Sequence, residues 1–251
     1  TLDVLSKITL EVMAPVDKPL PPGPIIGAAT ATEPEVVVSE SGIVADGYIS
    51  GARVFRDENE NETFDAGENF VITNAAGEFA GLGGSANKPI VADGNNGTAV
   101  DTSTGSVFNA VLSAPAGSKV VNPVTTIVNE LMQDSTSGVT TVAEANLEVA
   151  QVFGMEAVTS AGIDFTKFDP ISKKTFSDDG TSTAIADNNL ADITQGVATF
   201  VANLIVSGAA EKSREAGGDA AVLANTTKAI IGNIKDMVKT KSTASAQFDN
   251  N

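Results

Sequence analysis

One stretch of the chain repeats oxygen-bearing side chains at the spacing of a cation-binding loop. Residues 57–68 read DENENETFDAGE. In such a loop alternate side chains converge on one centre, the seventh position offers a backbone carbonyl, and a glutamate at the twelfth closes the shell with both oxygens. The spacing therefore predicts a shell of about six or seven oxygens, which suits the hard cation Ca²⁺. The candidate ligands are Asp57, Asn59, Asn61, Thr63, Asp65 and Glu68.

The loop departs from the helix-flanked form of this motif in two respects. Position 6 holds Glu62 where a glycine normally makes the sharp turn. The flanks 48–55 and 70–73 have the residue content of strands rather than helices. We therefore expect the loop to connect two strands, and to bind calcium in the weak extracellular range of about 10⁻⁴ to 10⁻³ M.

The charge of the loop also favours a bound cation. Six carboxylates and no base stand within twelve residues, and such a cluster repels itself unless a cation neutralises it. The alternative is a solvated acidic turn, since runs of charge are usually surface.

Two further groups could hold a cation. One lies in the segment DGNNGTAVD, and the other lies beyond residue 177. Because Asx-Gly clusters are what β-turns use, each group is interpreted first as turns and only second as a cation site. The residues are Asp93, Asn95, Asn96 and Asp101 in the first group and Asp178, Asp179, Asp187 and Asn188 in the second.

The composition of the whole chain removes several classes of chemistry. Its 251 residues include 32 acidic and 15 basic side chains, for a formal net charge of −17, and neither histidine nor cysteine. Catalytic triads, Cys-His pairs, thiol redox sites and zinc sites that use imidazole or thiolate are thus excluded. No clustered basic patch offsets the repulsion of phosphate, so we expect no nucleic-acid partner. No carboxylate pair is marked for glycosidase chemistry and no phosphate loop follows a strand, so we expect no enzyme.

Residues 36–121 carry the signals of short strands separated by clusters of Gly, Asn and Asp. Several short strands with such turns are typical of a β-sandwich of roughly immunoglobulin size. We therefore expect a calcium-binding β-sandwich over this range. The expected strands are 36–38, 43–55, 70–73, 77–82, 89–92 and 107–112.

A helical period replaces the strand pattern at residue 122. Asn122 and Pro123 form an N-cap and a first-turn proline. Thr141 and Glu144 form a capping box for a second helix, which Gly154 is placed to end. Two helices therefore follow the strand-rich region directly.

Two more helices are predicted over 193–205 and 223–238, where apolar residues recur at helical spacing. Four amphipathic helices can bury one shared core, so we expect a helical domain over 122–240, arranged as a bundle. The fold class is then α+β, with an N-terminal β-sandwich followed by helices. Residues 241–251 are polar and carry no helical period, which predicts a tail.

The connection 155–186 is polar and is expected to be a loop. Phe168 and Pro170 within it are expected to anchor the loop against the helices, with Asp169 as a turn residue.

The N-terminal region predicts a strand on a tether. Ile8, Leu10 and Val12 alternate with polar residues, and a proline-rich segment over 15–34 follows. Residues 1–35 are thus expected to form a strand and an arm. The strand can pair with its own sheet or be donated to a neighbouring subunit, and both alternatives stay open.

The residues around the acidic loop resemble a known family. Residues 47–57 read GYISGARVFRD and residues 73–79 read TNAAGEF. With the loop they resemble the prealbumin-like, B-type immunoglobulin modules of bacterial cell-surface proteins, including serine-aspartate-repeat adhesins. The likeness covers about residues 42–82 and departs from the family pattern at Glu62. It implies a surface-exposed, calcium-stiffened structural or adhesive module.

A second stretch, residues 112–128 with 168–170, is similar to segments that follow such modules in large secreted proteins of Gram-negative bacteria. Together with a chain that starts at Thr1 and shows no apolar stretch of transmembrane length, this leads us to expect an extracellular protein without a membrane span. We expect a calcium-binding structural subunit of a surface assembly or filament, joined by donation of the N-terminal strand between subunits. Its partners are then copies of itself or neighbouring surface proteins. The alternative is a monomeric adhesin or ligand-binding module of a larger surface protein.

Overall fold

The contacts of the chain divide it into two units, Thr1–Pro34 and Glu35–Asn251. The computed structural model describes residues 39–215, 217 and 220–248, all of which belong to the second unit. The expected strand with Ile8, Leu10 and Val12, the proline-rich arm and the strand expected at 36–38 lie outside the described residues.

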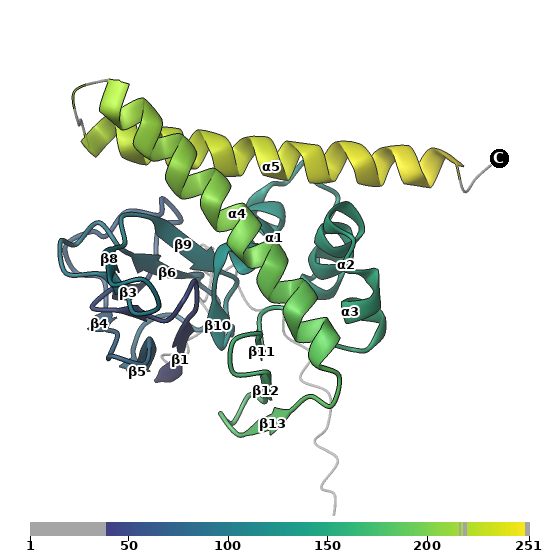
Figure 1. Cartoon of the computed structure of the whole chain (residues 1–251), viewed down its shortest axis with the longest axis horizontal. Coiled ribbons are helices and arrows are strands. Elements are labelled where there is room, and N and C mark those ends of the chain that lie inside the picture. The colour runs from purple at the N-terminus through teal and green to yellow at the C-terminus, as the bar shows by residue number, and fades with distance from the viewer. Residues whose placement is uncertain (1–38, 216, 218–219, 249–251) are drawn as a thin grey trace, which may run out of the picture. The chain divides into compact units, whose positions relative to one another are not determined.

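Ten short strands come first along the described chain (Figure 1). The sheet with the most strands has the order β4-β3-β6-β9 and is antiparallel throughout. In it Phe55 of β3 lies opposite both Phe70 of β4 and Val91 of β6. A second sheet has the order β10-β1-β5, in which β1 and β10 are parallel, and a third has the order β2-β7-β8. The strands are β1 (Glu40–Val44), β2 (Ile49–Ser50), β3 (Arg53–Arg56), β4 (Phe70–Ile72), β5 (Glu78–Leu82), β6 (Ile90–Asp93), β7 (Val100–Asp101), β8 (Ser106–Val107), β9 (Val111–Ala114) and β10 (Val120–Val121).

Helices α1 (Pro123–Gln133) and α2 (Val142–Phe153) begin at the predicted caps. Asn122 Oδ1 accepts the Thr125 N–H at 2.8 Å, and Thr125 Oγ1 accepts the Asn122 N–H at 2.8 Å. Thr141 and Glu144 form the same reciprocal pair for α2, and Gly154 ends α2 at φ 71°. The predictions for these two helices are confirmed.

The segment expected to be a loop over 155–186 contains regular structure instead. It holds a short helix, α3 (Glu156–Ser160), and a small antiparallel sheet of β11 (Phe168–Asp169), β12 (Lys174–Phe176) and β13 (Ser182–Ala184). All three residues of β13 are exposed, so the sequence has no apolar alternation to reveal this strand. Phe168 is fully buried, as an anchor must be.

Two long helices, α4 (Asn188–Glu215) and α5 (Ala220–Phe248), complete the described chain. They pack on each other and on α1, and α5 also packs on α2 (Figure 1). Helix α5 runs to Phe248, so the prediction of a non-helical tail from residue 241 was wrong for the residues up to 248. Extending a helix that tertiary contacts already hold is far easier than nucleating one, which explains a helix through polar sequence.

The strand-rich and helical parts share one hydrophobic core. Val54 and Leu112 from the sheet and Ile127 and Leu131 from α1 belong to the same buried cluster. Thr125 Oγ1 also donates to the Ser113 carbonyl at 3.0 Å, tying α1 to β9. The boundary expected at residue 121 is therefore a change of secondary structure within one packed unit. The coarse fold class, α+β with strands first and helices after them, is as predicted.

Helix α4 has an apolar stretch of note. Within the described residues, Asn188–Gly208 is long and apolar enough to cross a membrane by length and composition alone. The core helix of a soluble protein passes the same test. About a third of this stretch is buried: Val201 and Ile205 are fully buried, whereas Phe200 and Leu204 are 54% and 41% exposed.

Candidate cation-binding loop

The acidic loop connects two strands, as predicted. Strand β3 ends at Arg56 and β4 begins at Phe70, and the strands pair from Arg53↔Ile72 to Phe55↔Phe70. Phe64 fixes the middle of the loop, because its ring meets Phe55 edge-on at 5.5 Å and Phe70 at 5.2 Å between centroids. The Arg53 guanidinium covers the Phe64 ring at 4.5 Å. Aromatic and cation–π contacts thus hold the middle of the loop against its sheet.

The alternate side chains of the loop form one hydrogen-bonded network. Asp57 is fully buried, and its two carboxylate oxygens accept the backbone N–H groups of Asn61 at 3.1 Å and Glu62 at 2.7 Å. Asp65 Oδ2 accepts both side-chain amides, from Asn59 at 2.7 Å and Asn61 at 2.9 Å. These two amides lower the pKa of the Asp65 carboxyl. The structure therefore gathers four of the six predicted ligands in one network.

The last two predicted ligands close the loop through the backbone. Glu68 Oε2 accepts the Asp65 N–H at 2.9 Å, and Oε1 accepts the Glu58 N–H at 3.0 Å. The Thr63 N–H donates to Asn61 Oδ1 at 2.7 Å. The glutamate at the twelfth position thus holds both ends of the loop together.

Glu62 takes the conformation for which the motif normally uses glycine. Its φ is 60°, and Glu60 has φ 61°. A left-handed residue with a side chain costs about 1–2 kcal/mol. Glu62 therefore takes the left-handed turn in place of the glycine, at this backbone cost.

Glu58, Glu60 and Glu62 find partners outside the loop, elsewhere in the chain. Glu58 accepts the Ser85 N–H at 3.0 Å and the Ser85 hydroxyl. Glu60 pairs with Lys88 at 3.0 Å, and Glu62 pairs with Lys228 of α5 at 3.6 Å. The expectation that only a cation could relieve the repulsion among six carboxylates is therefore too strong, because distant bases relieve part of it.

The donor set of the inner residues fits a hard cation in kind, with carboxylate and amide oxygens and no base among them. As the side chains stand, no three acidic groups among the described residues lie close enough to hold a metal ion. A cation would have to replace the two amide N–H groups on Asp65, which a half-turn of each Asn amide allows. Calcium binding by this loop stays a prediction.

The second group of candidates serves as turn residues. Asp93 Oδ1 accepts the Asn95 N–H at 2.8 Å, and Oδ2 lies 3.5 Å from the Arg53 guanidinium. Asn96 donates to the Gly51 carbonyl at 2.7 Å. Asp101 accepts from the Ser103 N–H at 2.8 Å and from the Thr104 hydroxyl at 2.9 Å. These are the Asx turns of the first interpretation, and a cation here stays untested.

The third group also has local partners. Asp178 pairs with Lys167 at 2.7 Å, and Asp179 accepts the Thr181 N–H at 2.9 Å. Asp187 accepts the Asn189 N–H at 2.9 Å at the start of α4, whose first residue is Asn188.

The residues that carry the family resemblance have defined structural roles. Thr73 Oγ1 accepts the Ala52 N–H at 2.9 Å and donates to the Ile49 carbonyl at 2.7 Å. Gly77 has φ 74°, and a Cβ there would meet the Val44 carbonyl oxygen at 2.7 Å. These residues fix how the strands around the loop meet, so the motif is explained by packing as well as by any cation.

Asp169 does more than turn the chain. It is fully buried, its Oδ1 accepts the Ile171 N–H at 2.9 Å, and its Oδ2 accepts the Tyr48 hydroxyl at 3.0 Å. Burial and the Asp169 charge raise the pKa of Tyr48 to about 12. The only tyrosine of the chain is thus fixed to the turn after β11.

Two titratable residues escaped the sequence analysis. Burial and the neighbouring Glu62 raise the pKa of Glu130 in α1 to about 7. Burial and Asp101 likewise raise the pKa of Asp46, in the turn between β1 and β2, to about 7. Neither residue belongs to a local motif, and each meets its neighbour only through the tertiary fold, so spacing could not reveal them.

Comparisons of this chain with family models, with curated proteins and with solved structures gave no significant match. The fold and the loop define an α+β protein with a hydrogen-bonded acidic loop between two strands.

Proposed function

We propose that this protein is a calcium-binding structural subunit of an extracellular surface assembly, in which the N-terminal strand of one subunit is donated to the next. The strand-rich part is, in this proposal, a calcium-stiffened immunoglobulin-like sandwich. The observation that carries the proposal is the division of the β3–β4 loop: the predicted ligands hydrogen-bond within the loop, whereas Glu60 and Glu62 pair with lysines outside it and Glu58 accepts from Ser85.

An exposed sheet edge supports the assembly part of the proposal. Strand β4 lies at the edge of its sheet, and Phe70 and Ile72 on it are each 50% exposed. An apolar edge strand is a template for an added strand unless something covers it. The alternation of Ile8, Leu10 and Val12 suits such an addition. Head-to-tail donation makes an open polymer whenever the geometry does not close.

The test of calcium binding compares thermal melting of the protein in millimolar calcium and in excess chelator. We expect calcium to raise the melting temperature of the natural chain and of the Glu60→Gln variant, whose substitution removes a glutamate that pairs with Lys88 outside the loop. We expect no such rise in Asp65→Asn, where the central carboxylate is lost. Equal stabilisation of all three proteins would contradict the loop as the site.

The test of assembly is light scattering on the same samples. We expect growth into large species that is lost when residues 1–14 are deleted, while the truncated chain stays folded. Ile72→Thr should weaken assembly, and Val107→Thr, which changes an equally apolar, 64% exposed residue on β8, should not. A persistent monomer stabilised by calcium would favour the adhesin module instead. Normal assembly of the truncated chain would disprove strand donation.

A further inference from the structure

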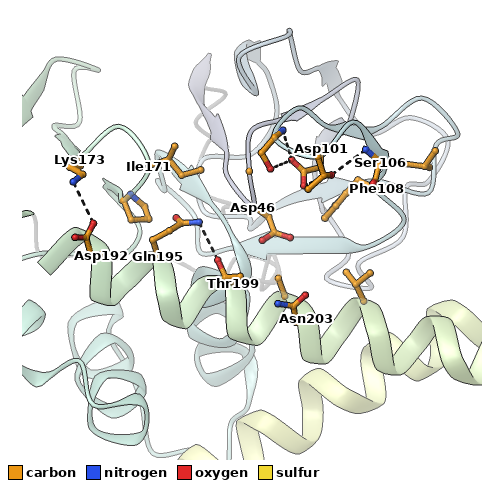
Figure 2. A pocket seen from close by; sticks show the side chains of 17 residues that line it. Asp46, Asp101, Ser106, Phe108, Ile171, Lys173, Asp192, Gln195, Thr199 and Asn203 are labelled. Atoms are coloured by element: carbon orange, nitrogen blue, oxygen red, sulfur yellow. Dashed lines mark hydrogen bonds and ion pairs between the residues drawn. The ribbon is translucent and has the colours of Figure 1, made fainter. Parts of the chain in front are cut away.

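A cavity of ≈560 Å³ opens between the strand-rich part and helix α4 (Figure 2). Four segments that are distant in sequence line it: the turn between β1 and β2 with Asp46, the hairpin of β7 and β8, residues 170–173, and one face of α4. Gln195, Thr199 and Asn203 follow one another at intervals of four residues and so share that face. A cavity of this size falls in the range of about 300–1,000 Å³ that small-molecule sites occupy.

Two residues that line the cavity, Asp46 and Gln195, carry acceptors without a donor among the described residues. Asp46 has no hydrogen-bond or ion-pair partner within the part of the chain that the structure describes. The Oε1 atom of Gln195 is buried without a hydrogen-bond partner, while its Nε2 donates to Thr199 at 3.4 Å. An acceptor held away from water without a donor is less stable than one that is hydrogen-bonded. A ligand with N–H donors could supply the hydrogen bonds that these acceptors lack.

The charges around Asp46 are mostly negative. Asp101 stands beside it on β7, and a Cβ on Gly47 would meet Asp101 Oδ1 at 2.2 Å, so this close approach requires the glycine. At the rim, Lys173 pairs with Asp192 of α4 at 3.5 Å. This pair offsets the one base among the described residues that line the cavity. The balance of the lining favours a cation over an anion.

The remaining walls combine the hydroxyl groups of Ser103, Thr104 and Ser106 with a set of apolar side chains. The apolar side chains come from Val107 and Phe108 of the hairpin, from Ile171, and from Ala202 and Val206 of α4. A group that suits both the acceptors and these walls has a cationic nitrogen on a short hydrocarbon body.

We propose that this cavity binds a small aliphatic primary amine, with its ammonium group held by the Asp46 carboxylate and Gln195 Oε1 and its hydrocarbon chain against Phe108, Ile171 and Val206. The site is separate from the acidic loop and needs no calcium. It would give the protein a small-molecule ligand in addition to its proposed structural role.

The proposed contact between the amine and Asp46 predicts a pH dependence of binding. Burial and Asp101 raise the pKa of Asp46 to about 7, so the carboxyl is partly protonated at neutral pH and becomes fully charged above it. The other charged groups that line the cavity are Lys173 and Asp192 at its rim. An ammonium ion binds the ionised form, so its affinity should rise between pH 6 and pH 8, by up to about tenfold per unit below the pKa.

The first experiment titrates the intact protein with n-butylammonium chloride and, separately, with butan-1-ol, and follows amide and carboxyl NMR shifts in excess chelator. The alcohol keeps the chain and replaces the ammonium by a hydroxyl. We expect saturable shifts at the cavity residues, with the amine bound at least about tenfold more tightly than the alcohol. Equal affinity for the two probes, or no saturable shifts in the cavity, would overturn the proposal.

The second experiment repeats the titration with Asp46→Asn and with a matched control, Asp236→Asn, on an exposed position of α5 away from the cavity. Asp46→Asn should lose the preference for the amine and its pH dependence, and the control should keep both. If Asp46→Asn still bound the amine more tightly than the alcohol, the ammonium group would be recognised by other residues and the proposal would be wrong.

If Asp46→Asn failed to fold, the carboxyl shift of Asp46 in the natural chain still decides the question. The amine must lower the pKa of Asp46, because it binds the ionised form. An unchanged pKa at saturating amine would rule out contact between the two.

Discussion

The acidic loop and the Asp46 cavity hold carboxylates in opposite ways. In the loop, Asp57 is fully buried yet accepts two backbone N–H groups, and two amides lower the pKa of Asp65. In the cavity, Asp46 has a carboxylate neighbour and no donor among the described residues, and its pKa rises to about 7. Asp65 and Asp46 differ both in burial and in donors: the two amides lower the pKa of the little-buried Asp65, whereas burial and the neighbouring Asp101 raise the pKa of Asp46. Burial and the supply of N–H donors therefore act on these two carboxyl groups in opposite directions.

The two regions also differ in how the chain builds them. The loop comes from twelve consecutive residues, and its donors are its own backbone and amides. The cavity comes from four distant segments. The loop is satisfied by its own turn geometry, whereas the cavity leaves Asp46 without a donor among the described residues.

The largest effect is expected where the loop is anchored to the core. Arg56, directly before Asp57, is fully buried, pairs with Glu40, and donates to the Lys88 carbonyl at 2.7 Å. Arg56→Met leaves Glu40 buried with only Lys119, at 3.6 Å, as its base. Breaking a buried pair in this way should cost about 3–5 kcal/mol of unfolding free energy, measured by urea denaturation.

The control for this prediction is Lys167→Met, which breaks a pair whose carboxylate partner, Asp178, is 84% exposed. An exposed pair should contribute about 0–1 kcal/mol. Equal losses in the two variants would mean that Arg56 does not anchor the loop through its buried charge.

A smaller loss is expected when the donors inside the loop lose their acceptor. Asp57→Asn keeps the shape of the side chain but replaces one carboxylate oxygen by an NH₂ group. In the variant this NH₂ group faces a backbone N–H that in the natural chain donates to the carboxylate oxygen. We expect a loss of about 1.5–3 kcal/mol, measured by thermal melting in chelator so that calcium does not contribute. Glu60→Gln, on the exposed side of the same loop, should change little. The comparison breaks if the two variants are equally stable.

Local signals in the sequence were enough for much of the fold. The caps at Asn122 and Thr141 and the left-handed Gly154 place two helices within a residue of where they lie, because capping depends only on neighbours in sequence. The flanks of the acidic loop were likewise predicted as strands and are strands.

The missed elements depend on partners far along the chain. β10 exists because Val121 lies beside Val44 in a parallel pair, and β7 because Asp101 lies opposite Ile49. Two-residue strands carry no period of their own. The predicted strand over 107–112 is divided for the same reason, since Val107 pairs with Val100 in one sheet and Val111 with Asp93 in another.

The residues of the candidate site could likewise be predicted only where they are neighbours in sequence. Spacing identified which loop residues form one network, because they are neighbours in sequence. It could not identify Lys88 and Lys228, which lie 28 and more residues away and neutralise glutamates of the loop. Nor could it reveal Asp46, whose raised pKa depends on Asp101 across two strands.

Asp46→Asn should change the pH dependence of stability. The folded-state pKa of about 7 lies above the unfolded value of about 3.9, so between these pH values the folded protein holds a proton that the unfolded chain has released. The contribution of Asp46 to stability therefore falls as the pH rises from about 4 to about 7. The variant lacks this loss and should be more stable than the natural chain at pH 8, by about 1–2 kcal/mol, and not at pH 4. If the melting temperatures of the variant and the natural chain differed by the same amount at every pH from 4 to 8, the pKa of Asp46 would not be raised in the folded protein.

The smallest effect concerns the backbone of the loop, and it needs two variants because Glu62 also pairs with Lys228. Glu62→Ala and Glu62→Gly both remove that pair, but only glycine adopts φ 60° without strain. Glu62→Gly should therefore be more stable than Glu62→Ala by about 1 kcal/mol in chelator. If the loop binds calcium through its inner oxygens, the glycine variant should also bind it more tightly than the alanine variant, because the bound turn is then unstrained. Alanine as stable as glycine would mean that the loop reaches the same network through a different turn, and the likeness of this position to the turn of a calcium loop would no longer support the proposed site.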